Sequence, residues 1–512
     1  MITKINSVGL SGIEGYRVQV EVDVSPGIPN WDIVGLPDIA VKESKERIRT
    51  AVKQMGFSIP GKRIVVNLAP ADVKKEGAYL DMPIALGILL ASEQLTNSLN
   101  LSDCVFLGEL SLDGKLRSIR GALPMAITAY QSGIKQIFLP KENAIEAAVV
   151  SGIEVYGIET LEDLFLHLSG EKILSPTQVD MDGLFRRAAQ TVLDFAEVKG
   201  QKNAKRALEV AAAGGHNLLF IGPPGSGKTM LAQRIPSILP DLSFEEALDV
   251  TKIHSIAGKL PKDQPMVLTR PFRSPHHTVS PVGLTGGGGN PKPGEVSLAH
   301  HGVLFLDELP EFQKQALEIL RQPLEDGRVS ITRASGTFSY PCNVMLVASM
   351  NPCPCGYYGD KSHTCTCAPK QISRYLGKVS GPLLDRIDLH IEVPAVAYEE
   401  LEQKQEMSET SAQIKERVNR ARAIQIKRYQ GSGIYSNSQL TPALMEKFCS
   451  LKPDAKELLK QAFENLGLSA RAHNRILKVA RTIADLAGSE TIEATHLAEA
   501  IGYRSLDRKF WA

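Results

Sequence analysis

The sequence predicts an α/β fold with a parallel central sheet and a helical region at the C-terminal end. Over residues 1–170, strand-like runs alternate with stretches of helical spacing, which is the pattern of an α/β domain. The apolar run at 218–221 leads into a glycine-rich motif and the run at 303–306 leads into two carboxylates, as strands of a parallel sheet do at a functional edge. From about residue 396 the apolar spacing is helical. We therefore expect two α/β domains followed by a helical one.

Composition sets the class of protein. The sequence holds 512 residues, which is room for about three domains. Its 43% hydrophobic and 22% charged residues are ordinary for a globular protein. The net charge of +1 excludes an overall basic field, so any nucleic-acid contact must come from local patches or a pore. No run of eighteen apolar residues and no apolar signal segment at the N-terminus occurs, so we expect a cytoplasmic protein with no membrane partner.

The first domain is expected at residues 1–170. Its predicted strands are 17–24, 63–68, 105–109 and 137–139, and its predicted helices are 39–55 and 82–92. Residues 171–190 contain Ser-Pro and little apolar periodicity, so we place a linker there. An Ala-rich helix then leads to the strand at 218–221.

A phosphate-binding motif follows that strand directly. Eight consecutive residues match G-x-x-x-x-G-K-[ST]: Gly222, Pro223, Pro224, Gly225, Ser226, Gly227, Lys228 and Thr229. The glycines let backbone N–H groups wrap a polyphosphate, and the helix that opens near Gly227 adds its positive end. Lys228 would reach the β- and γ-phosphates, and Thr229 would offer its hydroxyl to Mg²⁺. The sequence therefore predicts ATP and Mg²⁺ as cofactors.

Two carboxylates end the apolar run that begins at residue 303. Asp307 would hold the Mg²⁺ shell, and Glu308 would orient and deprotonate the attacking water. The alternative is a core strand followed by a surface acid pair, but the phosphate loop upstream favours the catalytic interpretation. Asn351 follows another predicted strand, 344–348, and lies where its amide can hold the lytic water.

An insert at residues 269–297 carries Arg270, Arg273, His276, His277 and a four-glycine run. We expect a mobile loop, either a pore loop whose cations meet phosphates or a surface connection. The two histidine pairs of this region, 276–277 and 300–301, lack the spacing of metal ligands on a helix.

Residues 327–341 predict a β-hairpin with a basic tip at Arg333. Arg270, Arg273 and Arg333 are the cations that we expect to contact nucleic-acid phosphates.

Four cysteines lie within fifteen residues: Cys353, Cys355, Cys365 and Cys367. Two C-x-C pairs can close a tetrahedral Zn²⁺ site, with His363 as a possible substitute ligand. A reducing compartment argues against disulfides. The alternatives are free thiols in a tight loop or a redox site.

Two arginines are candidates for the γ-phosphate. Arg386 lies in an apolar context at 381–389, which suits an arginine delivered to the nucleotide of a neighbouring subunit. The alternative is a local ion pair with Asp385 or Asp388. Arg471 lies at a helix start, where the helix dipole disfavours a cation unless an anion such as ATP faces it, and Arg475 is its rival.

Taken in order, these motifs resemble the magnesium-chelatase-like AAA+ ATPases, and more closely the ComM/YifB family. Segments 270–277 and 297–302 are similar to stretches particular to that family. The resemblance implies an AAA+ ATPase core at 191–395, with the cysteine cluster at 353–367 inside it, and a helical lid at 396–512. It also implies a hexameric ring with ATP between subunits, Arg386 acting in trans, Asn351 as first sensor and Arg471 as second sensor.

The first domain resembles the α/β domain of Lon-type proteases at 75–92 and 108–130. The position of the nucleophilic serine matches Asp81, and residues 120–124 offer no counterpart for the activating lysine. Without a hydroxyl and its base there is no nucleophile for acyl transfer. We expect a Lon-protease-like domain without proteolytic activity, with Asp81 as a buried structural or helix-capping carboxylate.

Members of the ComM type are implicated in DNA branch migration and helicase action during uptake of transforming DNA. The resemblance therefore implies an ATPase that translocates on single-stranded or branched DNA, in recombination or natural transformation. A remodelling subunit that acts on a protein or a metal-insertion partner, as magnesium chelatase does, is the alternative.

Overall fold

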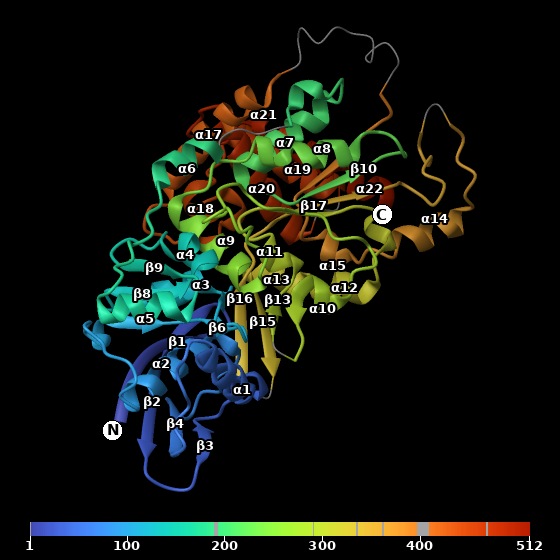
Figure 1. Ribbon diagram of the computed structural model, residues 1–512. Coiled ribbons are helices and arrows are strands. Elements are labelled where there is room, and N and C mark those ends of the chain that lie inside the picture. Colours follow the sequence, from blue (N-terminus) through green and yellow to red (C-terminus); the bar gives the residue numbers. More distant parts are fainter. Residues whose placement is uncertain are drawn as a thin grey trace. The chain divides into compact units, whose positions relative to one another are not determined.

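The structure is a computed structural model that describes residues 2–188, 193–289, 291–333, 336–360, 363–396, 409–466 and 469–511. The chain forms two compact units, and Figure 1 shows their elements. Unit 1 consists of Met1–Arg187, Ala247–Leu268 and Ala334–Ser339, and unit 2 consists of the remaining residues.

A four-stranded sheet in the order β1-β2-β4-β3 begins unit 1. Its strands are β1 (Ile2–Ser11), β2 (Glu14–Ser25), β3 (Asn30–Val34) and β4 (Arg63–Ala69). The β3–β4 pair is parallel, and the other two pairs are antiparallel. Alternate residues of β2 are buried, as the period of a half-buried strand requires. Two helices, α1 (Ile39–Gln54) and α2 (Asp81–Ala91), accompany this sheet, and α2 is buried along almost its whole length.

A second, parallel sheet completes the α/β part of unit 1. It has the order β5-β8-β9, from β5 (Cys104–Phe106), β8 (Gln136–Pro140) and β9 (Glu154–Ile158), and a short ladder joins β6 (Glu109–Leu110) to β7 (Leu116–Arg117). The helices here are α3 (Ala122–Gln131), α4 (Lys141–Ala147) and α5 (Leu161–Ser169). The predicted linker at 171–190 contains α6 (Met181–Ala188).

Most of α9 (Phe244–Ala257) belongs to unit 1, although it lies far along the chain. The buried Glu146 carboxylate accepts hydrogen bonds from the Ser255 hydroxyl and from the backbone N–H of Leu123. Burial raises the pKa of Glu146, and these donors oppose that rise. A segment that follows the phosphate loop in the sequence thus belongs to unit 1.

Unit 2 is built on a five-stranded parallel sheet in the order β11-β14-β17-β10-β18. Its strands are β10 (Leu218–Ile221), β11 (Phe272–Arg273), β14 (Val303–Leu306), β17 (Met345–Met350) and β18 (Leu389–Glu392). Every residue of β10, β14 and β17 is buried, as expected of strands covered on both faces. The carboxyl ends of these three strands lead into the phosphate loop, the acid pair and Asn351.

Helices surround this sheet and form the C-terminal region, as the sequence predicts. Those before residue 400 include α7 (Lys202–Gly214), α8 (Lys228–Arg234), α12 (Lys314–Ile319), α13 (Arg321–Asp326), α14 (Pro369–Leu376) and α15 (Gly381–Leu384). Those after it are α17 (Ser411–Arg428), α18 (Pro442–Phe448), α19 (Pro453–Leu466), α20 (Ala470–Leu486), α21 (Ala494–Gly502) and α22 (Ser505–Trp511). Helix α7 packs against α17 and α20, which joins the C-terminal helices to the sheet.

The prediction of a mobile loop at 269–297 is wrong for the residues that the structure describes there. The insert contributes β11 to the sheet and contains α10 (Pro281–Thr285), α11 (Glu295–Leu298) and a ladder between β12 (Gly286–Gly287) and β13 (Lys292–Pro293). A Cβ added to Gly294 would lie 2.3 Å from the Gly286 nitrogen. These glycines allow two backbone segments to approach closely, so they signal packing here rather than freedom.

The hairpin predicted at 327–341 is present as β15 (Arg328–Arg333) and β16 (Gly336–Pro341), which form a two-stranded sheet. Residues 334 and 335 of its tip lie outside the described residues. Within the part of the chain that is described, no helix has both the length and the apolar character needed to cross a membrane.

Candidate active site

The phosphate loop connects β10 to α8, as its motif predicts. Gly225 and Gly227 adopt left-handed conformations, with φ of 75° and 89°. A Cβ added to Gly222 would lie 2.1 Å from the Val393 carbonyl oxygen. Each of the three glycines therefore has a conformational or steric reason to be glycine.

Lys228 is buried at the start of α8, and its ammonium group faces the loop. Its Nζ donates to the carbonyl oxygens of Gly222 at 2.8 Å and Pro223 at 2.7 Å, and to Asn351 Oδ1 at 3.3 Å. Burial lowers the pKa of Lys228, while the charges of Asp307 and Glu308 act in the opposite direction. The structure thus brings the predicted lysine and the predicted sensor amide into contact.

Thr229 and Asp307 meet across the sheet edge. The Thr229 hydroxyl donates to Asp307 Oδ2 at 2.7 Å, and the Ser349 hydroxyl donates to Asp307 Oδ1. Hydroxyl and carboxylate oxygens are the donors that Mg²⁺ prefers, and Mg²⁺ keeps several waters besides. The donor set therefore fits the predicted magnesium ion.

Glu308 follows Asp307 with a left-handed φ of 54°, which is uncommon for a residue other than glycine. Its side chain is 60% exposed, and Oε2 lies 3.4 Å from Nδ1 of His277. The carboxylate is thus accessible to water, as a general base must be.

Sequence reasoning missed two of these contacts. Ser349 lies within a buried strand, where no motif marks it, and its role as a donor to Asp307 follows only from the pairing of β14 with β17. The sequence marked His277 only as one of the cations and histidines of the insert. Its approach to Glu308 depends on how the insert folds.

Arg386 is held within its own chain by the segment that precedes it and by α13. Its guanidinium donates to the carbonyl oxygens of Arg321 at 3.0 Å and Pro382 at 2.7 Å, and it forms an ion pair with Glu325. The alternative prediction named Asp385 or Asp388 as its partner, and those carboxylates pair with other arginines instead.

Arg471 and Arg475 differ in exposure. The Arg471 side chain is 68% exposed, and its Nη1 lies 3.4 Å from Asp385 Oδ2. The Arg475 side chain is only 16% exposed, and its Nε lies 3.4 Å from Asp388 Oδ1. Arg471 is therefore the more accessible side chain of this pair.

The three cations predicted to contact nucleic acid lie in different surroundings. Arg270 is 14% exposed and pairs with Glu246 at 2.8 Å, and Arg273 pairs with Glu295 at 2.6 Å. Contacts of these two with nucleic-acid phosphates would require the ion pairs to break. Arg333 is exposed, and its Nε lies 3.4 Å from the Gly288 carbonyl oxygen, so it remains available.

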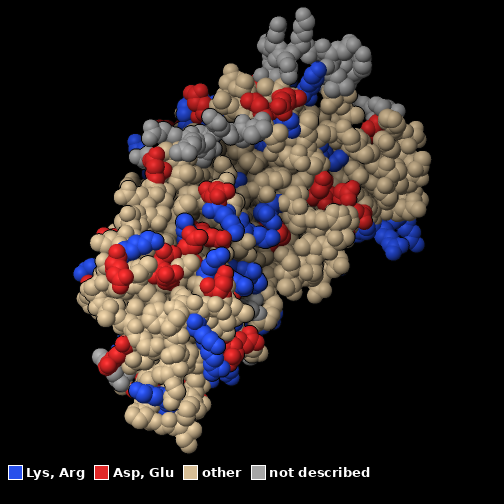
Figure 2. Space-filling view, in the orientation of Figure 1, with Lys and Arg blue, Asp and Glu red and all other residues tan. Residues whose placement is uncertain are grey.

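The surface carries charges of both signs. On the face drawn in Figure 2, basic and acidic side chains are interspersed, in keeping with the net charge of +1. Any attraction for a polyanion on this face must therefore be local.

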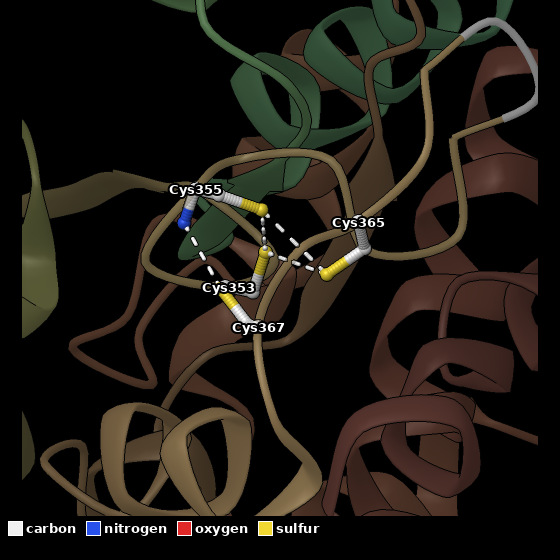
Figure 3. Close-up of side chains that lie close together, drawn as sticks. All are labelled: Cys353, Cys355, Cys365 and Cys367. Atoms are coloured by element: carbon white, nitrogen blue, oxygen red, sulfur yellow. Dashed lines mark hydrogen bonds between the residues drawn. The ribbon is translucent and has the colours of Figure 1, made fainter.

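The four predicted cysteines come together (Figure 3). The Cys353 sulfur lies 3.3 Å from that of Cys355 and 3.7 Å from that of Cys365, and the Cys355 and Cys365 sulfurs are 3.6 Å apart. The Cys367 sulfur accepts from the Cys355 N–H at 3.4 Å. Zn–S bonds of about 2.3 Å in a tetrahedron place sulfurs about 3.8 Å apart, so the cluster has the size of a zinc site.

Hydrogen bonding distinguishes one of these thiols. Backbone N–H groups of Tyr357 and Thr366 lower the pKa of Cys355 to about 5, which favours the thiolate that metals bind. His363, the predicted substitute ligand, stacks on Tyr357 with ring centroids 4.7 Å apart. The described residues that could hold a metal here are therefore the four cysteines.

Asp81 is a buried structural carboxylate, as predicted. It begins α2, where Arg47 Nε donates to Oδ2 at 2.7 Å and the Leu110 N–H donates to the same oxygen at 3.1 Å. Burial raises the pKa of Asp81 to about 6, although Arg47 opposes the rise. A paired carboxylate thus occupies the position that resembles the place of a nucleophile.

Three family models match the chain. They are magnesium chelatase, subunit ChlI, over residues 194–401; subunit ChlI of Mg-chelatase, over 20–143; and the magnesium chelatase subunit ChlI C-terminal model, over 408–504.

Several curated proteins are similar over nearly the whole length. Competence protein ComM of Haemophilus influenzae is 46% identical over 499 residues, which are 97% of this chain and 96% of that protein. The YifB protein of Escherichia coli is 44% identical over 498 residues, with the same shares covered. Lon protease of Mesomycoplasma hyopneumoniae is 26% identical over 175 residues, 32% of this chain and 20% of that protein. From the extent of these matches, the chain belongs to the ComM/YifB family of magnesium-chelatase-like AAA+ ATPases.

Proposed function

We propose that the chain is a ring-forming ATPase that couples ATP hydrolysis to movement on single-stranded or branched DNA. Helicase action or branch migration, in recombination or natural transformation, is the process that we infer. The observation that carries the ATPase part is the meeting of Lys228, Thr229, Asp307 and Asn351 at adjacent strand ends. Lys228 lies within hydrogen-bond distance of Asn351, and Thr229 lies within hydrogen-bond distance of Asp307, as groups of one phosphoryl-transfer site would.

Each group has a role in the proposed hydrolysis. Lys228 would exchange the loop carbonyls for β- and γ-phosphate oxygens, and Thr229 and Asp307 would hold Mg²⁺. Mg²⁺ would neutralise charge on the phosphates. Glu308 would take a proton from the attacking water, which Asn351 would orient.

A complete site needs a second subunit in this proposal. Arg386 would stabilise the charge that develops on the γ-phosphate of a neighbour, and Arg471 would contact the phosphates as a second sensor. The hexameric ring and the two sensor roles are what the resemblance to the family implies, and they are part of this proposal. Arg386 has its present contacts on α13 and on the segment before it.

The DNA part of the proposal rests on family and on position. The similar protein of Haemophilus influenzae is named for competence. Arg333 offers an exposed guanidinium at the end of β15, where a phosphate could meet it. Phosphate contacts of this kind lose affinity steeply as salt rises.

We further propose that the cysteine cluster holds a structural Zn²⁺. The mutual sulfur distances of 3.3–3.7 Å among Cys353, Cys355 and Cys365 support a four-coordinate site, with Cys367 as the fourth ligand. A closed site of four thiolates has no open position for catalysis, so the ion would order the loop that follows Asn351.

ATP turnover measured with and without single-stranded and forked DNA tests the main proposal. We expect DNA to raise turnover, Lys228→Ala to abolish ATP binding, and Glu308→Gln to bind ATP without hydrolysing it. Arg333→Ala should lose most of the DNA stimulation, whereas Arg328→Ala, at the other end of the same strand, should keep it. Normal hydrolysis by Glu308→Gln would contradict the site assignment.

A remodelling subunit of the chelatase kind is the second candidate, favoured by the family models that match. Such a protein would hydrolyse ATP normally but would neither bind DNA at low salt nor respond to it. The same assay therefore separates the two functions.

A further inference from the structure

The turn that begins the cysteine cluster ends at a glycine. The Gly356 N–H donates to the Cys353 carbonyl oxygen at 3.0 Å and closes this turn. Cys353 and Cys355, two of the proposed zinc ligands, lie on it (Figure 3). Gly356 itself has a left-handed φ of 89°. The conformation that presents these two thiols therefore also fixes the position of Gly356.

Gly356 packs directly against the phosphate loop. A Cβ added to Gly356 would lie 2.5 Å from Cδ and 3.3 Å from Cγ of Pro224. Any side chain at this position would therefore push against the proline ring, and glycine permits the close approach. Pro224 is one of the eight residues of the phosphate-binding motif. The cysteine cluster thus supports the loop that would hold ATP.

Packing is what fixes the ring of Pro224. On its N-terminal side, the Gly222 N–H donates to the Met350 carbonyl oxygen at 3.2 Å, and Lys228 Nζ donates to the Pro223 carbonyl oxygen at 2.7 Å. Proline has no N–H and an apolar ring, so neighbouring atoms must hold it. A binding loop has to be held to within about 0.5 Å for its N–H groups to converge on phosphate. A shift of Pro224 would therefore weaken ATP binding.

The turn at Gly356 is itself held through the cysteines. Residues 353–360 and 363–367 have no helix or strand. The Cys353 and Cys355 sulfurs approach that of Cys365 at 3.7 Å and 3.6 Å, and this approach joins the two segments. An ion bound by these thiols would fix segments that the backbone does not order.

We propose that the metal-bound cysteine cluster positions the phosphate loop through the contact of Gly356 with Pro224, and that the ion thereby raises the affinity of the chain for ATP. Gly356 is a positioning residue, because its effect on the nucleotide passes through Pro224. The inference rests on the proposed ATP site and on the proposed zinc ion. It adds to them that metal binding and nucleotide binding depend on each other.

Gly356→Ala in the full chain tests the contact by calorimetric titration with the non-hydrolysable ATP analogue AMP-PNP and Mg²⁺. The added Cβ must displace the Pro224 ring, so Kd should rise about tenfold. All four cysteines remain, so the zinc content should equal that of the parent. Gly431→Ala is the matched control, since Gly431 has a φ of 80° and no described atom lies within 4 Å of an added Cβ. It carries the same backbone strain and should leave Kd unchanged.

A double substitution separates this contact from a general loss of order. Pro224→Ala removes Cδ and Cγ, the atoms that the Gly356 Cβ would meet. In a Pro224→Ala background, Gly356→Ala should therefore change Kd by less than about 2-fold. A tenfold change in that background as well would overturn the proposed route through Pro224.

The metal is tested by the same titration. The double variant Cys353→Ser, Cys365→Ser should lose zinc and bind AMP-PNP about tenfold more weakly. The double variant Cys342→Ala, Cys449→Ala should keep both zinc and affinity. Zinc removed from the parent by a chelator, with Mg²⁺ then restored, should weaken binding to the same extent, and added Zn²⁺ should recover it.

The possible failures are distinguishable. An unchanged Kd in Gly356→Ala, or equal Kd values for zinc-loaded and zinc-free parent, would overturn the inference and leave the proposed ATPase function intact. A parent that binds AMP-PNP but holds no zinc would overturn the inference together with the zinc site. A parent that holds zinc but does not bind AMP-PNP would overturn the proposed ATPase function as well.

Discussion

Asp81 illustrates what a single residue decides in this chain. It stands at a position that resembles the nucleophile of a Lon-type protease, and it is 0% exposed. A carboxylate there cannot attack a peptide, but it can hold Arg47 and the backbone of the β6 region together. Asp81 therefore contributes a buried ion pair to unit 1 and does not act as a nucleophile for peptide cleavage.

The Asp81–Arg47 pair predicts a pH-dependent loss of stability in Arg47→Met. A raised pKa means that the folded state holds the Asp81 proton more tightly than the unfolded chain, so this contribution is present at low pH and is lost as pH rises through about 6. Without Arg47 the pKa rises further. We expect the free energy of unfolding to fall by about 3 kcal/mol at pH 8, and by less at pH 5, where the carboxyl is protonated.

Urea unfolding followed by Trp31 fluorescence measures this difference. Trp31 is buried in unit 1, and Trp511→Phe removes the other tryptophan of the sequence. Arg49→Met is the matched control, because its pair with Glu46 is exposed on both sides. Equal losses at pH 5 and pH 8 would show that Asp81 does not carry the effect.

At the scale of elements, the strands that deliver the active site could be predicted from the sequence alone. Leu218–Ile221 and Val303–Leu306 are fully apolar runs with a motif at one end, and a parallel sheet brings such ends together. The insert could not be predicted, because Gly286 and Gly294 are indistinguishable in sequence from flexible-loop glycines. Only the partner segments show that they pack backbone against backbone.

Contacts between side chains that are distant in the sequence could not be predicted either. His277 meets Glu308, and Asn217 meets Arg386, through pairings that depend on the order of strands in the sheet. The local sequence pattern determines whether a segment forms a helix or a strand. The arrangement of the whole sheet determines which elements lie beside it.

The cysteine cluster predicts that each chain binds about one zinc ion. Its ligands lie in segments without regular secondary structure, so the bound ion would supply order that the backbone does not. Metal analysis of the purified full chain should find zinc, and the double variant Cys353→Ser, Cys365→Ser should lose it. The double variant Cys342→Ala, Cys449→Ala removes two thiols outside the cluster and should retain it. A parent without zinc, or equal zinc in both variants, would contradict the site.

At the scale of the whole molecule, the proposed ring divides each reaction between two chains. Within one chain, Arg386 is engaged by Glu325 and by main-chain carbonyls, and Lys228 by the phosphate loop. A head-to-tail interface would present the arginine of one subunit to the loop of the next, and such interfaces close into rings. Activity should then depend on which chains are neighbours.

Mixing two inactive variants tests that division. Lys228→Ala lacks a working phosphate loop but keeps Arg386, whereas Arg386→Ala keeps the loop and lacks the arginine, so each alone should lose hydrolysis by about 10³-fold or more. In rings assembled from equal amounts, about one interface in four joins an intact loop to an intact arginine, and the mixture should regain about a quarter of the parent rate. Lys228→Ala mixed with Glu308→Gln should regain nothing, because both lesions fall on the same side of the interface. If the first mixture also stayed inactive while each variant bound its neighbours, Arg386 would act on the nucleotide of its own chain, and the ring would not be needed for chemistry.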